Sequence, residues 1–238
     1  MHYIFTIEGN IGSGKSTLLN ILKQNLTNIN DVEIEYLPEP VSMWESITDT
    51  DGINIIEKFY NDNKKYAFSF QMMAYISRIH QIKKTLKGKK NVIIICERSV
   101  FTDKKVFTQM LYDDKKISEI DYQIYNNWFY EFIRDIPISG IIYLKTDTEI
   151  CSKRVVKRNR TGEDIPIEYL ENCNKYHNKW LLYESIPLII LNGNQDFNKN
   201  LPKTWINILK TFIIDLSPTF STSMKTPNVL IDNGMPIF

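Results

Sequence analysis

The stretch Gly9–Thr17 constrains this chain more than any other. It reads GNIGSGKST, which matches the pattern G-x-x-x-x-G-K-S of a phosphate-binding loop, or P-loop. An apolar run, residues 3–7, precedes it, and leucine and isoleucine residues at helical spacing follow it. This order of strand, loop and helix is the context in which the pattern indicates a nucleoside triphosphate site. A glycine-rich turn that matches by chance is the competing interpretation, which the context disfavours.

The residue types of the loop suit this task. Glycine tolerates positive φ and lets the backbone approach a ligand closely. Loop N–H groups and the start of the next helix then face a polyphosphate. We expect Lys15 to reach the β- and γ-phosphates and the hydroxyl of Ser16 to bind Mg²⁺. The expected ATP-binding residues of the loop are Gly9, Asn10, Gly12, Ser13, Gly14, Lys15, Ser16 and Thr17.

Five short apolar runs alternate with helical patterns along the chain. This alternation predicts an α/β fold in which a five-stranded parallel sheet is flanked by helices, as in P-loop kinases. The predicted strands are residues 3–7, 32–37, 92–96, 140–144 and 188–191. The predicted helices are residues 17–26, 63–86, 118–134, 148–157, 166–183 and 202–214. We expect one domain over residues 1–216 and a tail over 217–238, either flexible or docked on a neighbour as an extended segment.

Composition limits the classes of protein to which the chain can belong. Of 238 residues, 43% are hydrophobic, which is enough for one substantial core. A formal net charge of +1 gives no reason to expect nucleic acid or a membrane surface as partner. No apolar run approaches the roughly 20 residues of a membrane span. The first strand is expected almost at Met1, which leaves no room for a targeting peptide, and three cysteines without metal spacing suit a reducing compartment. We expect a cytoplasmic protein, in the host cytoplasm if the chain is viral.

Charged residues follow two of the predicted strands, at the sheet edge where ligands bind in parallel sheets. Glu39 lies between two prolines, and a carboxylate held near the phosphate site can take a proton from an acceptor hydroxyl. An ordinary exposed loop glutamate is the alternative. Glu97 and Arg98 follow the strand 92–96. Glu97 is placed to assist Mg²⁺, and Arg98 to neutralise phosphate oxygens or to keep Glu39 ionised, unless the two form a structural ion pair.

Basic residues collect at the end of the predicted helix 148–157 and in the loop after it. The spacing puts Arg154 and Arg158 on one helical face, with Arg160 shortly beyond. A solvated basic face is the common reason for such a run. A lid over about residues 157–165 is the functional interpretation, because arginines that close over a triphosphate neutralise charge in the transition state.

The predicted helix 118–134 carries more aromatic residues than one buried stripe accommodates. Positions 121, 125, 128, 129 and 132 share a face. Core packing is one interpretation. A helix–helix interface of a homodimer is the other, because aromatic residues are enriched at interfaces.

An ordered set of motifs makes the chain resemble the deoxyribonucleoside kinases. The motifs are GNIGSGKST, PEPVSMW, FY followed by YAFSFQMMAYISRI, ICERSVFTD, GIIYLKT, KRNRTGEDIPIEYLE and HNKWL, and they cover roughly residues 1–215. The family contains deoxycytidine, deoxyguanosine and insect multisubstrate kinases, with herpesviral thymidine kinases as distant relatives. The resemblance implies Mg²⁺-dependent transfer of the γ-phosphoryl group of ATP to the 5′-hydroxyl of a deoxynucleoside.

The resemblance also implies individual roles. Glu39 would be the general base, with Lys15 and Arg98 as the other catalytic residues and Ser16 and Glu97 as the metal site. The expected nucleoside-binding residues are Trp44, Phe70, Gln71, Arg78, Asp103 and Phe107 around the base, Tyr60 and Glu163 at the sugar 3′-hydroxyl, and Glu39 and Arg98 at the 5′-hydroxyl. The further ATP-binding residues would be Arg154, Arg158 and Arg160 at the phosphates, and Asp196 and Phe197 beside the base of the donor.

Arg78 and Asp103 bear on the choice of base. Family members with an arginine and an aspartate at these positions resemble the deoxycytidine and deoxyguanosine kinases, which implies a preference for deoxycytidine or purine deoxynucleosides. A thymidine kinase or a nucleoside monophosphate kinase is the near alternative. A catalytically silent, kinase-like interaction subunit is the alternative from another class.

Overall fold

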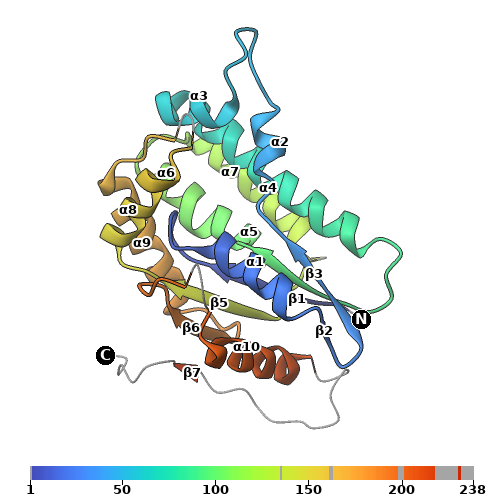
Figure 1. Cartoon of the computed structure of the whole chain (residues 1–238). Helices are drawn as coiled ribbons and strands as arrows, with labels where there is room; N and C mark the ends of the chain where they lie inside the picture. The colour runs from blue at the N-terminus through green and yellow to red at the C-terminus, as the bar shows by residue number, and fades with distance from the viewer. Residues whose placement is uncertain (1, 135, 161–162, 198–200, 218–229, 232–238) are drawn as a thin grey trace.

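A mostly parallel β-sheet lies at the centre of the computed structural model, which describes residues 2–134, 136–160, 163–197, 201–217 and 230–231 (Figure 1). The predicted strands are all present, as β1 (His2–Glu8), β3 (Val32–Leu37), β4 (Val92–Glu97), β5 (Gly140–Lys145) and β6 (Leu188–Asn192). They pair in parallel in the order β3-β4-β1-β5-β6. Two additional two-residue strands extend the sheet at its edges, namely β2 (Asn28–Ile29) beside β3 and β7 (Leu230–Ile231) beside β6.

Helices surround the sheet, and the six predicted helices are found with ends shifted by a few residues. They are α1 (Lys15–Asn25), α4 (Asn63–Leu86), α7 (Glu119–Ile133), α8 (Thr148–Arg158), α9 (Ile167–Leu181) and α10 (Lys203–Leu216). The sequence patterns missed several short elements, which are α2 (Val41–Glu45), α3 (Ile55–Asn61), α5 (Val100–Thr102), the π-helix η1 (Asp103–Thr108) and α6 (Gln109–Asp113). Helices α2 and α3 are too short for a periodic pattern, whereas α5, η1 and α6 follow one another without a gap over residues 100–113.

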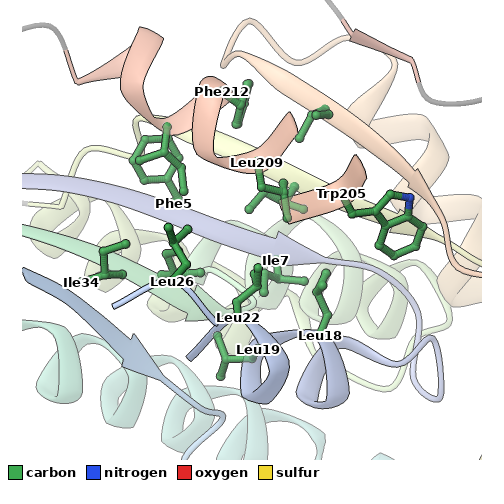
Figure 2. Close-up of a cluster of buried hydrophobic side chains, with 14 of the residues drawn as sticks. Phe5, Ile7, Leu18, Leu19, Leu22, Leu26, Ile34, Trp205, Leu209 and Phe212 are labelled. Atoms are coloured by element: carbon green, nitrogen blue, oxygen red, sulfur yellow. The ribbon is translucent and has the colours of Figure 1, made fainter. Parts of the chain in front are cut away.

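Both faces of the sheet are covered, which explains why β4 is buried at every position. One face packs against α1 and α10, and Figure 2 shows Phe5 and Ile7 of β1 lying among leucines of α1 and apolar residues of α10. The other face packs against α4 and α7 and, farther along the sheet, against α9. Gly140 permits the close approach of α10, because a Cβ atom there would lie 2.8 Å from a methyl carbon of Leu216.

The carboxyl ends of three neighbouring strands meet at one sheet edge. β1 ends at Glu8 and leads directly into the glycine-rich loop, while β3 ends two residues before Glu39 and β4 ends at Glu97. This arrangement brings together residues that are far apart in the sequence. The candidate site residues at these strand ends therefore lie at one edge of the sheet.

The described part of the chain buries only some of the aromatic residues of α7, as the sequence predicted. Tyr125 and Phe129 are buried, and they pack against α4 in the core. Trp128 is 48% exposed and Tyr130 is 57% exposed. An apolar face thus remains at the surface of this chain.

The predicted tail lies almost entirely outside the described residues. Its described part, Leu230–Ile231, pairs in parallel with Ile189 and Ile190 of β6 in the same chain. Within the described ranges, no helix combines the length and the apolar character that crossing a membrane requires.

Candidate active site

The loop Gly9–Thr17 has the tight course that its glycines predict. Gly9, Gly12 and Gly14 have φ angles of 147°, 78° and 102°. A Cβ atom on Gly12 would lie 2.4 Å from the carbonyl oxygen of Cys151, and one on Gly14 would lie 2.9 Å from the ring of Phe197. The loop is therefore closely packed, and side chains at these positions would displace its neighbours.

Lys15 is buried at the start of α1, and its Nζ donates to the carbonyl oxygen of Asn10 at 2.6 Å. Burial and, next in size, the nearby charge of Arg98 lower the pKa of Lys15 to about 8, against the opposing charges of Glu97 and Glu39. The next residue, Ser16, donates its hydroxyl to Oε1 of Glu97 at 2.7 Å. A hydroxyl and a carboxylate oxygen held side by side are ligands of the type that Mg²⁺ takes together with phosphate oxygens, so this pair fits the metal.

Glu39 is clamped by two guanidinium groups. Its Oε1 accepts from Nη1 of Arg98 at 2.6 Å and from Nη2 of Arg78 at 3.2 Å. Burial raises the pKa of this carboxyl, but the charges of Arg98, Arg78 and Lys15 outweigh burial and lower the pKa to about 2. The carboxylate is therefore ionised at neutral pH. The sequence alternative of an ordinary exposed loop glutamate is wrong, because the side chain is only 15% exposed.

Arg98 combines an unusual backbone with unused donors. Its φ is 62°, in the left-handed region that is uncommon for non-glycine residues other than asparagine and aspartate. Its guanidinium lies over the ring of Phe107 at 5.3 Å. Its Nε and Nη2 are buried and find no hydrogen-bond acceptor among the described residues. Since Arg98 forms its ion pair with Glu39, this arrangement favours the role at the site over a structural pair with Glu97.

Arg78 and Asp103 form a buried ion pair. Nε and Nη2 of Arg78 reach the two carboxylate oxygens of Asp103 at 3.0 and 3.3 Å, and Nη1 donates to the carbonyl oxygen of Glu97 at 2.7 Å. Burial raises the pKa of Asp103, although the charge of Arg78 opposes this. Asp103 and Phe107 both belong to η1 and both line the cavity described below, whereas Arg78 lies behind its wall.

A cavity of about 630 Å³ joins the glycine-rich loop to an aromatic pocket. Trp44 and Phe70 line this pocket with their rings nearly perpendicular, and the indole N–H of Trp44 donates to Oγ of Ser77 at 2.9 Å. Gln71 is 2% exposed, and its side-chain oxygen has no hydrogen-bond partner in the described part of the chain. An unpartnered buried acceptor beside aromatic rings is suited to a planar ligand that donates a hydrogen bond.

The three predicted lid arginines have different partners. Arg154 donates to the carbonyl oxygens of Ser13 at 3.0 Å, of Gly193 at 2.9 Å and of Gln195 at 3.1 Å, and so links α8 to two loops. Arg158 and Arg160 instead form ion pairs with Glu163, at 2.5 and 3.7 Å. Residues 161–162 of the predicted lid lie outside the described residues. All three arginines line the cavity.

Most of the predicted site residues line this one cavity. They are Gly12, Gly14, Lys15, Ser16, Thr17, Glu39, Trp44, Tyr60, Phe70, Gln71, Glu97, Arg98, Asp103, Phe107, Arg154, Arg158, Arg160, Glu163 and Phe197. Gly9, Asn10 and Ser13 shape the loop without lining the cavity, and Asp196 is exposed outside it.

Sequence reasoning missed several apolar lining residues, namely Val41, Ile56, Phe59, Ala74 and Tyr169. Ala74 is the one that sequence position could have indicated, because it lies one helical turn after Phe70 on α4 and faces the same way. Phe59 stacks on Phe70 with ring centroids 4.7 Å apart, a contact between two helices that no sequence pattern reveals.

Comparisons with known proteins agree with this geometry. The family model described as deoxynucleoside kinase matches residues 5–213. A protein of fowlpox virus described as a probable deoxycytidine kinase is 37% identical over 226 residues, which cover 90% of each chain. Human deoxycytidine kinase is 32% identical over 242 residues, covering 89% of this chain and 91% of the human one. A mitochondrial deoxyguanosine kinase of Xenopus laevis is 29% identical over 224 residues, covering 82% and 83%. The chain belongs to the deoxynucleoside kinase family.

Proposed function

We propose that this kinase transfers the γ-phosphoryl group of ATP, in the presence of Mg²⁺, to the 5′-hydroxyl of a deoxynucleoside. One observation carries the proposal. The ionised carboxylate of Glu39, held by Arg78 and Arg98, lines the same cavity as Lys15 and Ser16 of the glycine-rich loop. A proton acceptor and a phosphate-binding loop in one cavity are what transfer to a hydroxyl requires.

The residues suggest a division of labour during transfer. Phosphoryl transfer needs positioning and charge stabilisation more than covalent chemistry. Lys15 and the free donors of Arg98 are suited to the phosphate oxygens, and Glu39 to accepting the proton of the attacking hydroxyl. Mg²⁺, held through Ser16 and Glu97, would supply further neutralisation of phosphate charge. Arg154, with its carbonyl partners, would keep the loop and the donor-base segment at Phe197 in place.

The pocket supports deoxycytidine or a purine deoxynucleoside as acceptor. Gln71 offers an amide to the edge of a base, and its oxygen is still without a partner among the described residues. Asp103, paired with Arg78, presents carboxylate oxygens that suit an exocyclic amine. The relatives named deoxycytidine and deoxyguanosine kinase support the same preference.

A panel of acceptors tests the proposal. The four deoxynucleosides are each assayed with ATP and with UTP, and deoxycytidine monophosphate is included as an alternative acceptor. We expect rapid turnover of deoxycytidine or a purine deoxynucleoside and slow turnover of thymidine. Preferred use of the monophosphate would identify a nucleoside monophosphate kinase instead. Failure of every acceptor would revive the silent interaction subunit.

We further propose that two copies associate through α7. The support is the apolar surface of this helix, where Ile120, Ile124, Trp128 and Tyr130 are 71%, 40%, 48% and 57% exposed. Analytical ultracentrifugation of Trp128→Glu tests this, with Tyr183→Glu as the control because Tyr183 is 86% exposed and lies beyond α9. We expect a dimer for the unchanged chain and the control, and a monomer for Trp128→Glu.

The cytoplasm, of the host cell if the chain is viral, is the compartment that we propose. The support is the similarity to the fowlpox virus protein and the presence of three free, buried cysteines. Fractionation of cells that express a tagged chain checks this, and recovery in an organelle fraction would contradict it.

A further inference from the structure

The carboxylate of Glu163 already has two cationic partners in the structure. Its Oε2 lies 2.5 Å from Nη2 of Arg158, and its Oε1 lies 3.7 Å from Nη1 of Arg160. The side chain of Glu163 is 6% exposed, whereas those of Arg158 and Arg160 are 35% and 32% exposed. The carboxylate is thus largely removed from water and depends on the arginines for its neutralisation.

In the roles that the resemblance implies, Arg158 and Arg160 would contact the donor phosphates and Glu163 the sugar of the nucleoside. Arg158 and Arg160 line the cavity together with Lys15, where a triphosphate would attract them. Glu163 lies in the same cavity near Tyr60, whose pKa is raised by burial and by the charge of Glu163. A carboxylate that is occupied by guanidinium groups offers fewer lone pairs to a sugar hydroxyl. An arginine that is paired with a carboxylate neutralises less of the charge of a phosphate.

We propose that Glu163 exchanges partners, from Arg158 and Arg160 to the nucleoside sugar, and that this exchange makes donor and acceptor binding mutually favourable. The inference rests on the proposed function and concerns how its two substrates influence each other. Either substrate alone must disrupt the ion pairs and leave one side without a partner. When donor and nucleoside are both bound, the ion pairs of Glu163 are disrupted only once, and the arginines and the carboxylate all have new partners. Each substrate therefore favours the binding of the other, which is positive coupling.

The size of the effect follows from the strength of the pairs. Coupling free energies of this kind correspond to factors of roughly 5 to 150 in affinity. Because the arginines are about one-third exposed, we expect the lower end, about fivefold. Reciprocity requires the nucleoside to tighten donor binding by the same factor as the donor tightens nucleoside binding.

Calorimetric titration of the full chain tests the inference. The Kd of the best deoxynucleoside from the panel is measured alone and with a non-hydrolysable ATP analogue plus Mg²⁺, and the Kd of the analogue is measured with and without the nucleoside. In the unchanged chain we expect about fivefold tightening in both directions.

The distinguishing variant is Arg158→Met. It frees Glu163, so we expect the nucleoside alone to bind more tightly than in the unchanged chain and the coupling factor to fall towards one. Arg160→Met is the second variant, and the longer pair predicts a smaller change in the same direction. Lys153→Met is the matched control, because Lys153 is exposed on the same helix α8 and does not line the cavity. It should bind as the unchanged chain does.

The outcomes separate this inference from the function on which it rests. If Arg158→Met binds the nucleoside no more tightly and Arg160→Met behaves likewise, the exchange is wrong. If the unchanged chain phosphorylates a deoxynucleoside but shows no coupling, only the exchange is overturned. If it neither binds nor phosphorylates one, the proposed function fails as well.

Discussion

Two clusters of oppositely charged residues lie at one cavity, and they are built differently. In the strand-edge cluster, Glu39, Arg78, Arg98 and Asp103 come from separate elements, and their side chains are between 3% and 15% exposed. In the arginine cluster, Arg158, Arg160 and Glu163 lie within six consecutive positions, and both arginines are about one-third exposed. The first cluster is therefore fixed by the core, and the second by contacts within a single segment.

This difference in construction suits the two clusters to different tasks. Groups held by a packed core keep their geometry without a ligand, which suits the accurate placement of an acceptor and a proton. Groups paired within one segment, with arginines about one-third exposed, can change partners more readily, which suits a response to ligand binding. The following predictions are ordered from the largest expected effect to the smallest.

The substitution Glu39→Gln tests the chemical role of the strand-edge cluster. The amide keeps the size of the side chain but cannot accept the proton of the hydroxyl, so kcat should fall by about 10²- to 10⁴-fold. Nucleoside binding should remain measurable by calorimetry. Glu163→Gln is the comparison, and it should act mainly on the KM of the nucleoside. Full activity of Glu39→Gln would overturn the general-base assignment.

The structural contrast predicts unequal losses of stability. Arg78→Met leaves Asp103 buried without its cation, which should cost about 3–5 kcal/mol of the free energy of unfolding. Arg158→Met leaves Glu163, whose side chain is 6% exposed, with Arg160 as a remaining cation, so the loss should be smaller than for Arg78→Met. Urea denaturation of both variants measures the difference. Equal losses would show that the two clusters do not differ as described.

The strand-edge cluster should also make stability depend on pH. The pKa of Glu39 is about 2 in the folded chain and 4.5 as a reference value, so the unfolded chain binds the proton first as pH falls. Its contribution is fully present above about pH 4.5 and is lost as pH falls towards 2, with a slope of at most about 1.4 kcal/mol per pH unit. The free energy of unfolding, measured from pH 6 to pH 3, should be less steep in Glu39→Gln.

His177 also makes the free energy of unfolding depend on pH in this range, and its contribution must be separated from that of Glu39. Burial lowers the pKa of His177 from 6.5 to about 3, so its contribution to stability is full above about pH 6.5 and falls as pH approaches 3. Since Glu39→Gln retains His177, the difference between the two curves isolates Glu39.

Lys15 lines the same cavity and provides the mildest test. Its pKa of about 8 means that the ammonium loses its proton above that pH in the free enzyme, whereas bound triphosphate favours the charged form. ATP binding should therefore take up a proton and weaken by up to about tenfold per pH unit above pH 8. Calorimetry in buffers of different ionisation enthalpy detects this uptake. An ATP affinity that stays constant from pH 7 to pH 10 would contradict it.

Much of the fold followed from local patterns. The burial of both faces of β4 was readable from its consecutive branched residues, and the glycine-rich loop placed β1 and α1. The short strands β2 and β7 and the π-helix η1 were not readable, because two residues carry no period and a single π-helical turn has no residue pattern of its own.

The sequence indicated the candidate residues of the site but not all of the ion pairs that they form. Position after the predicted strands indicated Glu39 and Arg98, and the resemblance indicated Glu163. Neither indicated that Arg78 also reaches Glu39, or that Glu163 accepts from Arg158. Such pairs depend on how separate elements are placed to within an ångström, which spacing along the chain does not fix.

The left-handed backbone of Arg98 limits which mutations this position accepts. Glycine and asparagine adopt a φ of 62° readily, but neither carries a cation for Glu39. Lysine carries a cation but cannot offer several donors in one plane, and it pays the same backbone penalty as arginine. No single substitution satisfies both demands. In a saturation mutagenesis screen for growth that depends on this enzyme, codon 98 should be among the least tolerant in the gene.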